Sequence, residues 1–198
     1  MMPDHDRLRS AVRLVALLNL AYFGVEFLVA LRIGSVSLLA DSVDFLEDAA
    51  VNLLIFAALG WSATRRARVG MLLAGVLLIP AGAFLWTLWH KFNAPVPPDA
   101  IPLTATGLGA LAINLFCAFT LARFRHHSGS LTKAAFLSAR NDAVANIAII
   151  AAGVATLFWR SIWPDIVVGL GIALMNLDAA RAVWTAARTE HRTSLEQA

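Results

Sequence analysis

The segment from Gly34 to Asn52, GSVSLLADSVDFLEDAAVN, carries four acidic residues in a stretch that otherwise has the composition of a membrane helix. At about 100° per residue, a helix places most of its polar side chains on one narrow stripe: Ser37, Asp41, Asp44, Asp48 and Asn52, with Glu47 at the edge. A carboxylate at mid-bilayer costs about 2.5–3.5 kcal/mol, whereas a Leu, Ile or Phe returns only about 0.3–0.6 kcal/mol. The stripe must therefore face protein, water or a bound ion, and we predict that it binds a divalent cation.

The composition indicates an integral membrane protein. Of 198 residues, 59% are hydrophobic and only 15% are charged, against about 45–50% and about 25% in soluble domains. The net charge of +3 does not indicate nucleic-acid binding, because the basic residues lie at predicted helix ends on one side of the membrane. We expect no nucleic-acid partner, no prosthetic group and no enzyme activity.

Six segments are long and apolar enough to cross a bilayer. They are Val12–Leu31, Ser37–Trp61, Val69–Trp89, Ile101–Leu121, Leu131–Phe158 and Pro164–Trp184. The short connections make consecutive helices antiparallel neighbours. The predicted fold is an all-α membrane protein, a six-transmembrane-helix bundle over residues 11–187, with a short N-terminus (1–10) and a tail (188–198).

The basic residues predict the orientation. Twelve Lys and Arg lie in the N-terminus, the second and fourth connections and the C-terminus, whereas the alternate connections hold three, Arg32, Lys91 and Arg160. Cytoplasmic segments carry an excess of Lys and Arg. Both termini are therefore predicted to be cytoplasmic in a multi-pass protein of the membrane, and we expect a bacterial inner membrane.

Two pairs of residues, each four apart, have the spacing of a metal site. Asp44 and Asp48 lie on one face of the second helix, and Ser138 and Asp142 share a face of the fifth. Neighbouring carboxylates repel each other unless a cation or a proton neutralises them. Since no histidine falls at mid-membrane, an all-oxygen site favours manganese, magnesium or ferrous iron over copper, and zinc and cobalt also accept carboxylates.

Further polar residues of the predicted helices are candidates for a secondary or pathway role. They are Asn19 and Glu26 on the first helix, Asp41 and Glu47 on the second, and Asn141 and Asn146 on the fifth. Arg140, inside the fifth helix, must find an acid or water. An internal ion pair with Arg140 is the alternative to a ligand role for Asp41 or Glu47, and packing is the alternative for Asn146.

Two motifs, GSVSLLADSVDFLED in the second helix and SGSLTKAAFLSARNDAVAN in the fifth, resemble those of the cation diffusion facilitator family. The resemblance extends from about Arg13 to Arg188. It implies export of divalent metals in exchange for protons, with a transport site formed by a pair four apart on each of these two helices. Asp44, Asp48 and Asp142 match the family pattern.

The sequence departs from that pattern in two places. Ser138 stands where relatives usually have His or Asp, so Asn141 or a water would have to complete the ligand set. We also expect the chain to be a short form without the cytoplasmic domain that many relatives carry after the sixth helix. A homodimer would then have to form through the membrane helices.

The sequence therefore predicts a secondary transporter that exports a divalent metal (Zn, Co, Mn or Fe class) by proton antiport and alternating access. Three alternatives stay open: a transporter of another cation, a non-transporting partner subunit of a metal exporter, and an intramembrane aspartyl protease. Asp44 or Asp48 with Asp142 could imitate the protease dyad, but the Gly-x-Gly-Asp signature is absent.

Overall fold

The computed structural model describes the backbone of residues 3–58, 63–122 and 129–176, and side chains of residues 7–53, 56, 76, 78–122 and 141–176. The helices are α1 (Pro3–Ile33), α2 (Val36–Ala58), α3 (Ala63–Asn93), α4 (Ala100–Ala122) and α5 (Gly129–Phe158). A sixth helix begins at Trp163 and is described to Asn176. Each predicted span corresponds to one of these helices, so the six-helix prediction is confirmed.

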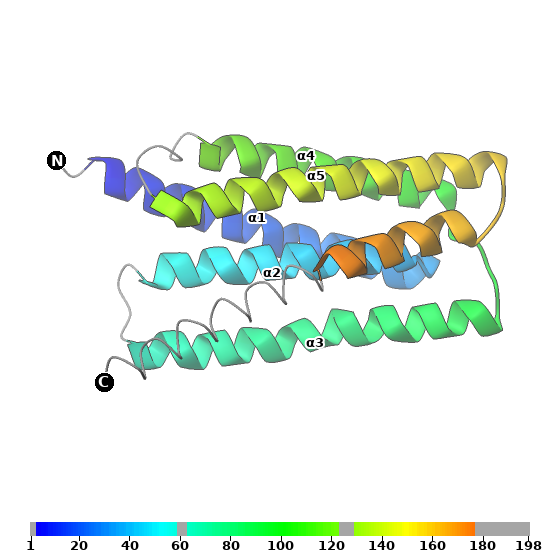
Figure 1. The fold of residues 1–198 in the computed structure, drawn as a ribbon, viewed down its shortest axis with the longest axis horizontal. Coiled ribbons are helices and arrows are strands. Elements are labelled where there is room, and N and C mark those ends of the chain that lie inside the picture. Colours follow the sequence, from blue (N-terminus) through cyan, green and yellow to red (C-terminus); the bar gives the residue numbers. More distant parts are fainter. Residues whose placement is uncertain (1–2, 59–62, 123–128, 177–198) are drawn as a thin grey trace, which may run out of the picture.

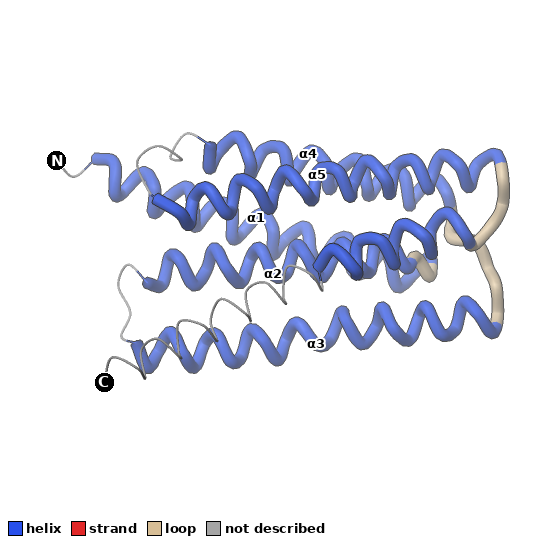
Figure 2. The backbone as a smooth tube through the Cα atoms, viewed as in Figure 1, coloured by secondary structure: helices blue, strands red, loops and turns tan. Residues whose placement is uncertain are grey.

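The helices run along the long axis of the molecule in alternating directions (Figure 1). The most extensive contacts join α4 to α5 and α1 to α2, α1 also packs on α4, and α3 packs mainly on α2. The described connections, which follow α1, α3 and α5, all lie at one end of the bundle (Figure 2). We call this the Gly34 end.

Three described helical segments are long and apolar enough to cross a membrane: Arg7–Ile33, Ala100–Ala122 and Asn141–Phe158. Many of their large hydrophobic side chains point outward, for example Leu28 at 67% and Phe119 at 69% exposure. In a soluble protein such a surface would be costly, but a bilayer covers it. The chain is an all-helical integral membrane protein.

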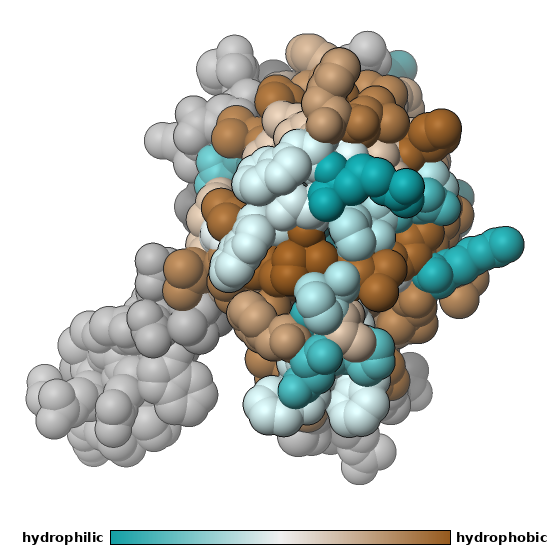
Figure 3. Space-filling model, turned by 90° about the vertical axis from the view of Figure 1, so that its right-hand side faces the viewer, coloured by the Kyte–Doolittle hydropathy of each residue, from teal (hydrophilic) through white to brown (hydrophobic). Residues whose placement is uncertain are grey.

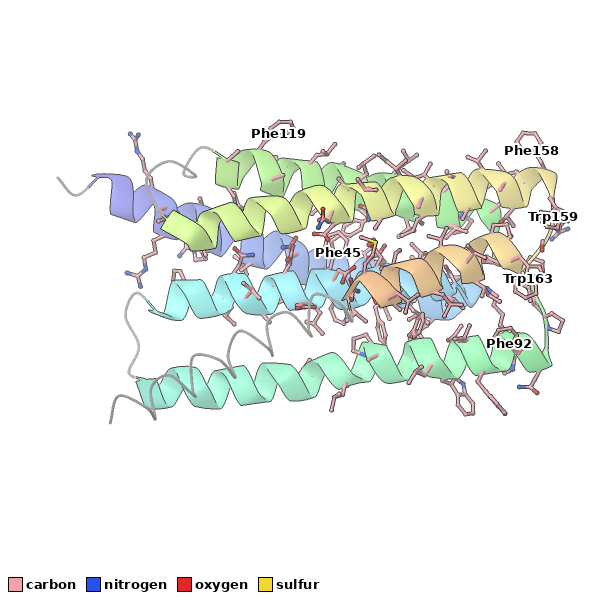
Figure 4. All side chains as sticks on the ribbon, in the orientation of Figure 1. Phe45, Phe92, Phe119, Phe158, Trp159 and Trp163 are labelled. Atoms are coloured by element: carbon pink, nitrogen blue, oxygen red, sulfur yellow. The ribbon has the colours of Figure 1, made fainter. Side chains whose placement is uncertain are left out.

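Aromatic side chains gather at the Gly34 end, where Phe92, Phe158, Trp159 and Trp163 lie close to the ends of their helices (Figure 4). All four are exposed. This is the arrangement of an interfacial belt. Seen from that end, polar residues also gather on the end face (Figure 3), which fits a surface that meets water. Trp61 and Trp184, at the ends of two predicted spans, lie outside the described residues.

Glycines shape the packing around the start of α2. Gly34 has a φ of 64°, a left-handed conformation that glycine adopts at little cost, and it lets the chain reverse between α1 and α2. Gly169 faces the same turn from the sixth helix. A Cβ atom there would lie 2.8 Å from the carbonyl carbon of Val36, so only glycine allows this close approach of the two backbones.

Candidate functional site

The polar stripe of α2 faces largely into the bundle, in agreement with its predicted phase. Ser37 and Asp41 have no exposed surface and Asn52 is 3% exposed. Asp44 and Asp48 are partly buried. Glu47, at the predicted edge of the stripe, is exposed. The helix therefore carries its carboxylates in three different environments, although they are close neighbours in sequence.

Asp142 of α5 lies close enough to this stripe for the charges to interact. Repulsion from Asp48 acts on Asp142, and the charge of Asp142 acts in turn on Asp44. Helices α2 and α5 are also in contact. The structure thus places the three carboxylates, which come from two separate helices, within range of each other's charge.

The three carboxylates do not form a closed ligand shell. Among the described side chains, no three His, Cys, Asp or Glu residues are grouped closely enough to hold a metal ion. The side chain of Ser138, the predicted fourth ligand, lies outside the described residues, as does that of Arg140. Ligand roles for Asp44, Asp48, Asp142 and Ser138 therefore stay predictions, as does the ion pair of Arg140.

A buried chain of hydrogen bonds lies beside this carboxylate group. The side-chain amide of Asn114 on α4 donates to Oδ1 of Asn146 at 3.2 Å, and the amide of Asn146 donates to Oδ2 of Asp41 at 2.7 Å. All three residues are at most 2% exposed. Asp41 is therefore held by Asn146 of α5, which lies about one helical turn after Asp142. Asn141, in contrast, is exposed.

The polar residues of α1 also point inward. Asn19 and Glu26 have no exposed surface, and the Sγ atom of Cys117 on α4 lies 3.7 Å from Oδ1 of Asn19. Tyr22, which lies between Asn19 and Glu26 in the sequence of α1, donates a 2.6 Å hydrogen bond to the carbonyl oxygen of Thr106. The interior of the bundle is thus lined by polar groups from α1, α2, α4 and α5.

A second polar cluster lies at the Gly34 end, and the sequence did not predict it. Asp165, fully buried at the start of the sixth helix, accepts hydrogen bonds from the hydroxyls of Ser35 and Ser37 at 2.7 Å each. It also accepts from the backbone N–H groups of Val36 at 2.9 Å and Ser37 at 3.0 Å. These N–H groups belong to the first turn of α2, which has no internal acceptors for them.

Lys91, near the end of α3, completes this cluster. Its ammonium group binds Asp165 and donates a 2.6 Å hydrogen bond to the carbonyl oxygen of Gly34. The sequence offered one weak signal, because Lys91 and Asp165 are charged residues in segments with very few other charges. Asp178, another polar residue of the sixth predicted span, lies outside the described residues.

An all-helical membrane bundle with carboxylates of two neighbouring helices facing its interior has the architecture of a cation transporter. The sequence model of the cation efflux transmembrane domain matches residues 12–188 of the chain. The chain belongs to this family, the cation diffusion facilitators, as its two motifs predicted. Members of the family are transporters of divalent cations rather than enzymes. A search of curated proteins finds no match to this chain.

Proposed function

We propose that this protein exports a divalent metal cation from the cytoplasm in exchange for protons, through a site formed by Asp44, Asp48 and Asp142. The observation that carries the proposal is the placement of Asp142 on α5 within electrostatic range of the two aspartates of α2. Three mutually repelling carboxylates in a membrane interior need a compensating positive charge. A divalent cation or protons supply it in turn, which is the basis of an exchange.

Alternating access would expose this one site first to the cytoplasm and then to the outside. Bound metal neutralises the carboxylates in the first state. In the second, protons take the place of the metal, and the protonated site returns. Ser138, one turn before Asp142 on α5, or a water molecule would complete the coordination shell.

The proposed ligands are all oxygen atoms, and this limits the metals that the site can bind. Carboxylate and hydroxyl oxygens suit manganese and ferrous iron, and they also accept zinc and cobalt. The imidazole that usually favours zinc would stand at position 138, where this chain has serine. We therefore place the substrate in the Zn, Co, Mn and Fe class, with preference for the harder ions.

The domain boundaries and the setting follow from the same proposal. Residues 11–187 would form the transport domain, between a cytoplasmic N-terminus (1–10) and a cytoplasmic tail (188–198), in a bacterial inner membrane. Helix α3 makes its main contacts with α2 and exposes Leu78, Trp86 and Trp89. A homodimer would form through such membrane-facing helices.

Metal flux into sealed vesicles tests the proposal. We expect Asp48→Asn and Asp142→Asn each to reduce manganese and zinc uptake driven by a proton gradient by at least tenfold, because each removes one charge of the site. Asp99→Asn, the same change at an exposed position in the α3–α4 connection, should transport as the unmodified protein does. Undiminished flux in both site variants would rule out this site.

Ser138 is the one feature that favours the second candidate, a non-transporting partner subunit. Such a protein would lack a complete ligand set and would not bind metal alone. Equilibrium binding of manganese, zinc and cobalt to the purified protein separates the two functions. Binding that is lost in Asp48→Asn supports the transporter, whereas no binding by the unmodified protein supports the partner subunit.

A further inference from the structure

Several buried polar atoms of α1 and α2 have no hydrogen-bond partner. Among the described side chains, five buried atoms have no partner, and four of them belong to Asn19, Glu26 and Asp41. Both carboxyl oxygens of Glu26 and Oδ1 of Asp41 are in this group. Since an unsatisfied buried polar group costs about 1–3 kcal/mol, and more when charged, these atoms require an explanation.

The hydrogen-bond chain from α4 and α5 fixes the role of Asp41. Asn146 accepts from Asn114 through its oxygen, so its amide nitrogen faces Asp41 and donates to it. Asp41 is therefore an acceptor at Oδ2. The hydrogen bond from the Asn146 amide favours the carboxylate form of Asp41 over its protonated form.

The carboxyl groups of Glu26 on α1 and Asp41 on α2 are close enough to interact, and the two helices pack on each other. Two ionised carboxylates can only accept, so neither can satisfy the other. One proton between them changes this, because a protonated carboxyl is also a donor. We propose that Glu26 and Asp41 form a proton-binding site, in which Glu26 is protonated and its O–H group donates a hydrogen bond to Oδ1 of Asp41.

The surroundings favour a proton over a metal ion at this position. The titratable groups that act on the pair are Tyr22 on α1, Asp44 and Asp48 on α2, and Asp142 on α5. α4 contributes the neutral Asn114 and Cys117. Among the described groups that act on the pair, none is cationic. A metal would find too few ligands, but a proton needs only two oxygens.

This site is distinct from the proposed metal site. Asp41 precedes Asp44 by three residues, so the pair lies nearly one helical turn closer to the Gly34 end of α2. It binds its proton whether or not metal is transported. Only the role of this proton in transport rests on the proposed function. If the proposed antiport holds, the pair provides a place for a proton between the metal site and that end of the bundle.

Infrared spectroscopy of the purified protein at neutral pH tests the assignment without metal or transport. The unmodified protein, labelled with glutamate carrying 13C in its carboxyl group, should show the carbonyl band of a protonated carboxylic acid, shifted by the label. Glutamates exposed to water are ionised at this pH and do not contribute to this band. The absence of a label-sensitive acid band would overturn the proposal.

Variants then locate the proton. Glu26→Gln should lose the band, and because a glutamine amide can still donate to Asp41, this variant should keep its thermal stability. Glu47→Gln, the same change at an exposed glutamate of α2, should keep the band. In Asp41→Asn the new amide can donate to Glu26, so the band should be lost or shifted. A band unchanged in Glu26→Gln or in Asp41→Asn would contradict a shared proton.

Discussion

The ammonium nitrogen of Lys91 lies 2.5 Å from Oδ2 of Asp165, and the two side chains are 4% and 0% exposed. This buried ion pair joins the end of α3 to the start of the sixth helix. Through the other contacts of Asp165 it also fixes the first turn of α2. The helix that carries the candidate metal ligands is therefore held at its Gly34 end by two helices distant in sequence.

Removal of Asp165 should destabilise the protein more than removal of Lys91. Asp165→Ala leaves the Lys91 charge buried without its partner and frees the first N–H groups of α2, and we expect a loss of about 3–5 kcal/mol. Lys91→Ala should cost less, because Ser35, Val36 and Ser37 still donate to Asp165. Thermal unfolding in detergent measures both. Arg160→Ala, at an exposed position of the same end, is the control, and equal losses in all three variants would contradict the prediction.

The close approach of the sixth helix to α2 predicts a sharp difference between two glycines. Gly169→Ala places a Cβ atom 2.8–2.9 Å from backbone atoms of Val36 and Ser37, which cannot move without displacing the start of α2. We expect a loss of about 1–3 kcal/mol and a lower midpoint of thermal unfolding. Gly171→Ala, on the same helix, meets no atom within 4 Å and should be neutral or slightly stabilising. The prediction is wrong if both variants unfold at the same temperature.

Asn146 should be more important for stability than an ordinary polar residue in a helix. Asn146→Leu removes the donor to Asp41 and the acceptor for Asn114, leaving two buried polar groups unpaired. We expect destabilisation by about 1–3 kcal/mol for each group left without a partner, seen as a fall in the unfolding midpoint. Asn93→Leu, exposed at the end of α3, is the matched change. A midpoint for Asn146→Leu no lower than that of Asn93→Leu would show that the buried chain contributes little.

Position 138 should control metal preference. Ser138→His introduces an imidazole four residues before Asp142 on α5, and imidazole nitrogen suits zinc better than manganese. We expect zinc affinity to rise by at least tenfold relative to manganese, measured by competition binding on the purified protein. Ser161→His, in the connection after α5, controls for adventitious zinc binding. A zinc-to-manganese ratio that does not change would remove Ser138 from the coordination shell.

Much of the architecture could be predicted because its signal is local. The length and apolar composition of the runs located all six helices. The spacing of Ser37, Asp41 and Asn52 along α2 correctly predicted a face that turns away from lipid. Asp44, Asp48 and Asp142 were selected by spacing and family motif, and the tertiary structure brings Asp142 near the other two, although their role as ligands is still a prediction.

The partners of individual polar groups could not be predicted in this way. Asp41 and Glu47 are six residues apart on one helix, yet the first is buried against Asn146 and the second is exposed. That difference depends on where α1 and α5 pack on α2. In the sequence, Lys91 is one of three basic residues in the alternate connections, and its partner Asp165 lies 74 residues away.

The sequence alone thus determined that the chain is a six-helix membrane bundle with acids inside, because apolar periodicity and the cost of charge in lipid act within each helix. The tertiary structure decided which acid meets which donor. Asp41 meets Asn146, and Asp165 meets Lys91 and the first turn of α2, because hydrogen bonds between helices depend on their relative rotation and separation. Those two quantities are set by packing across the whole bundle, through close contacts such as that of Gly169 with Val36.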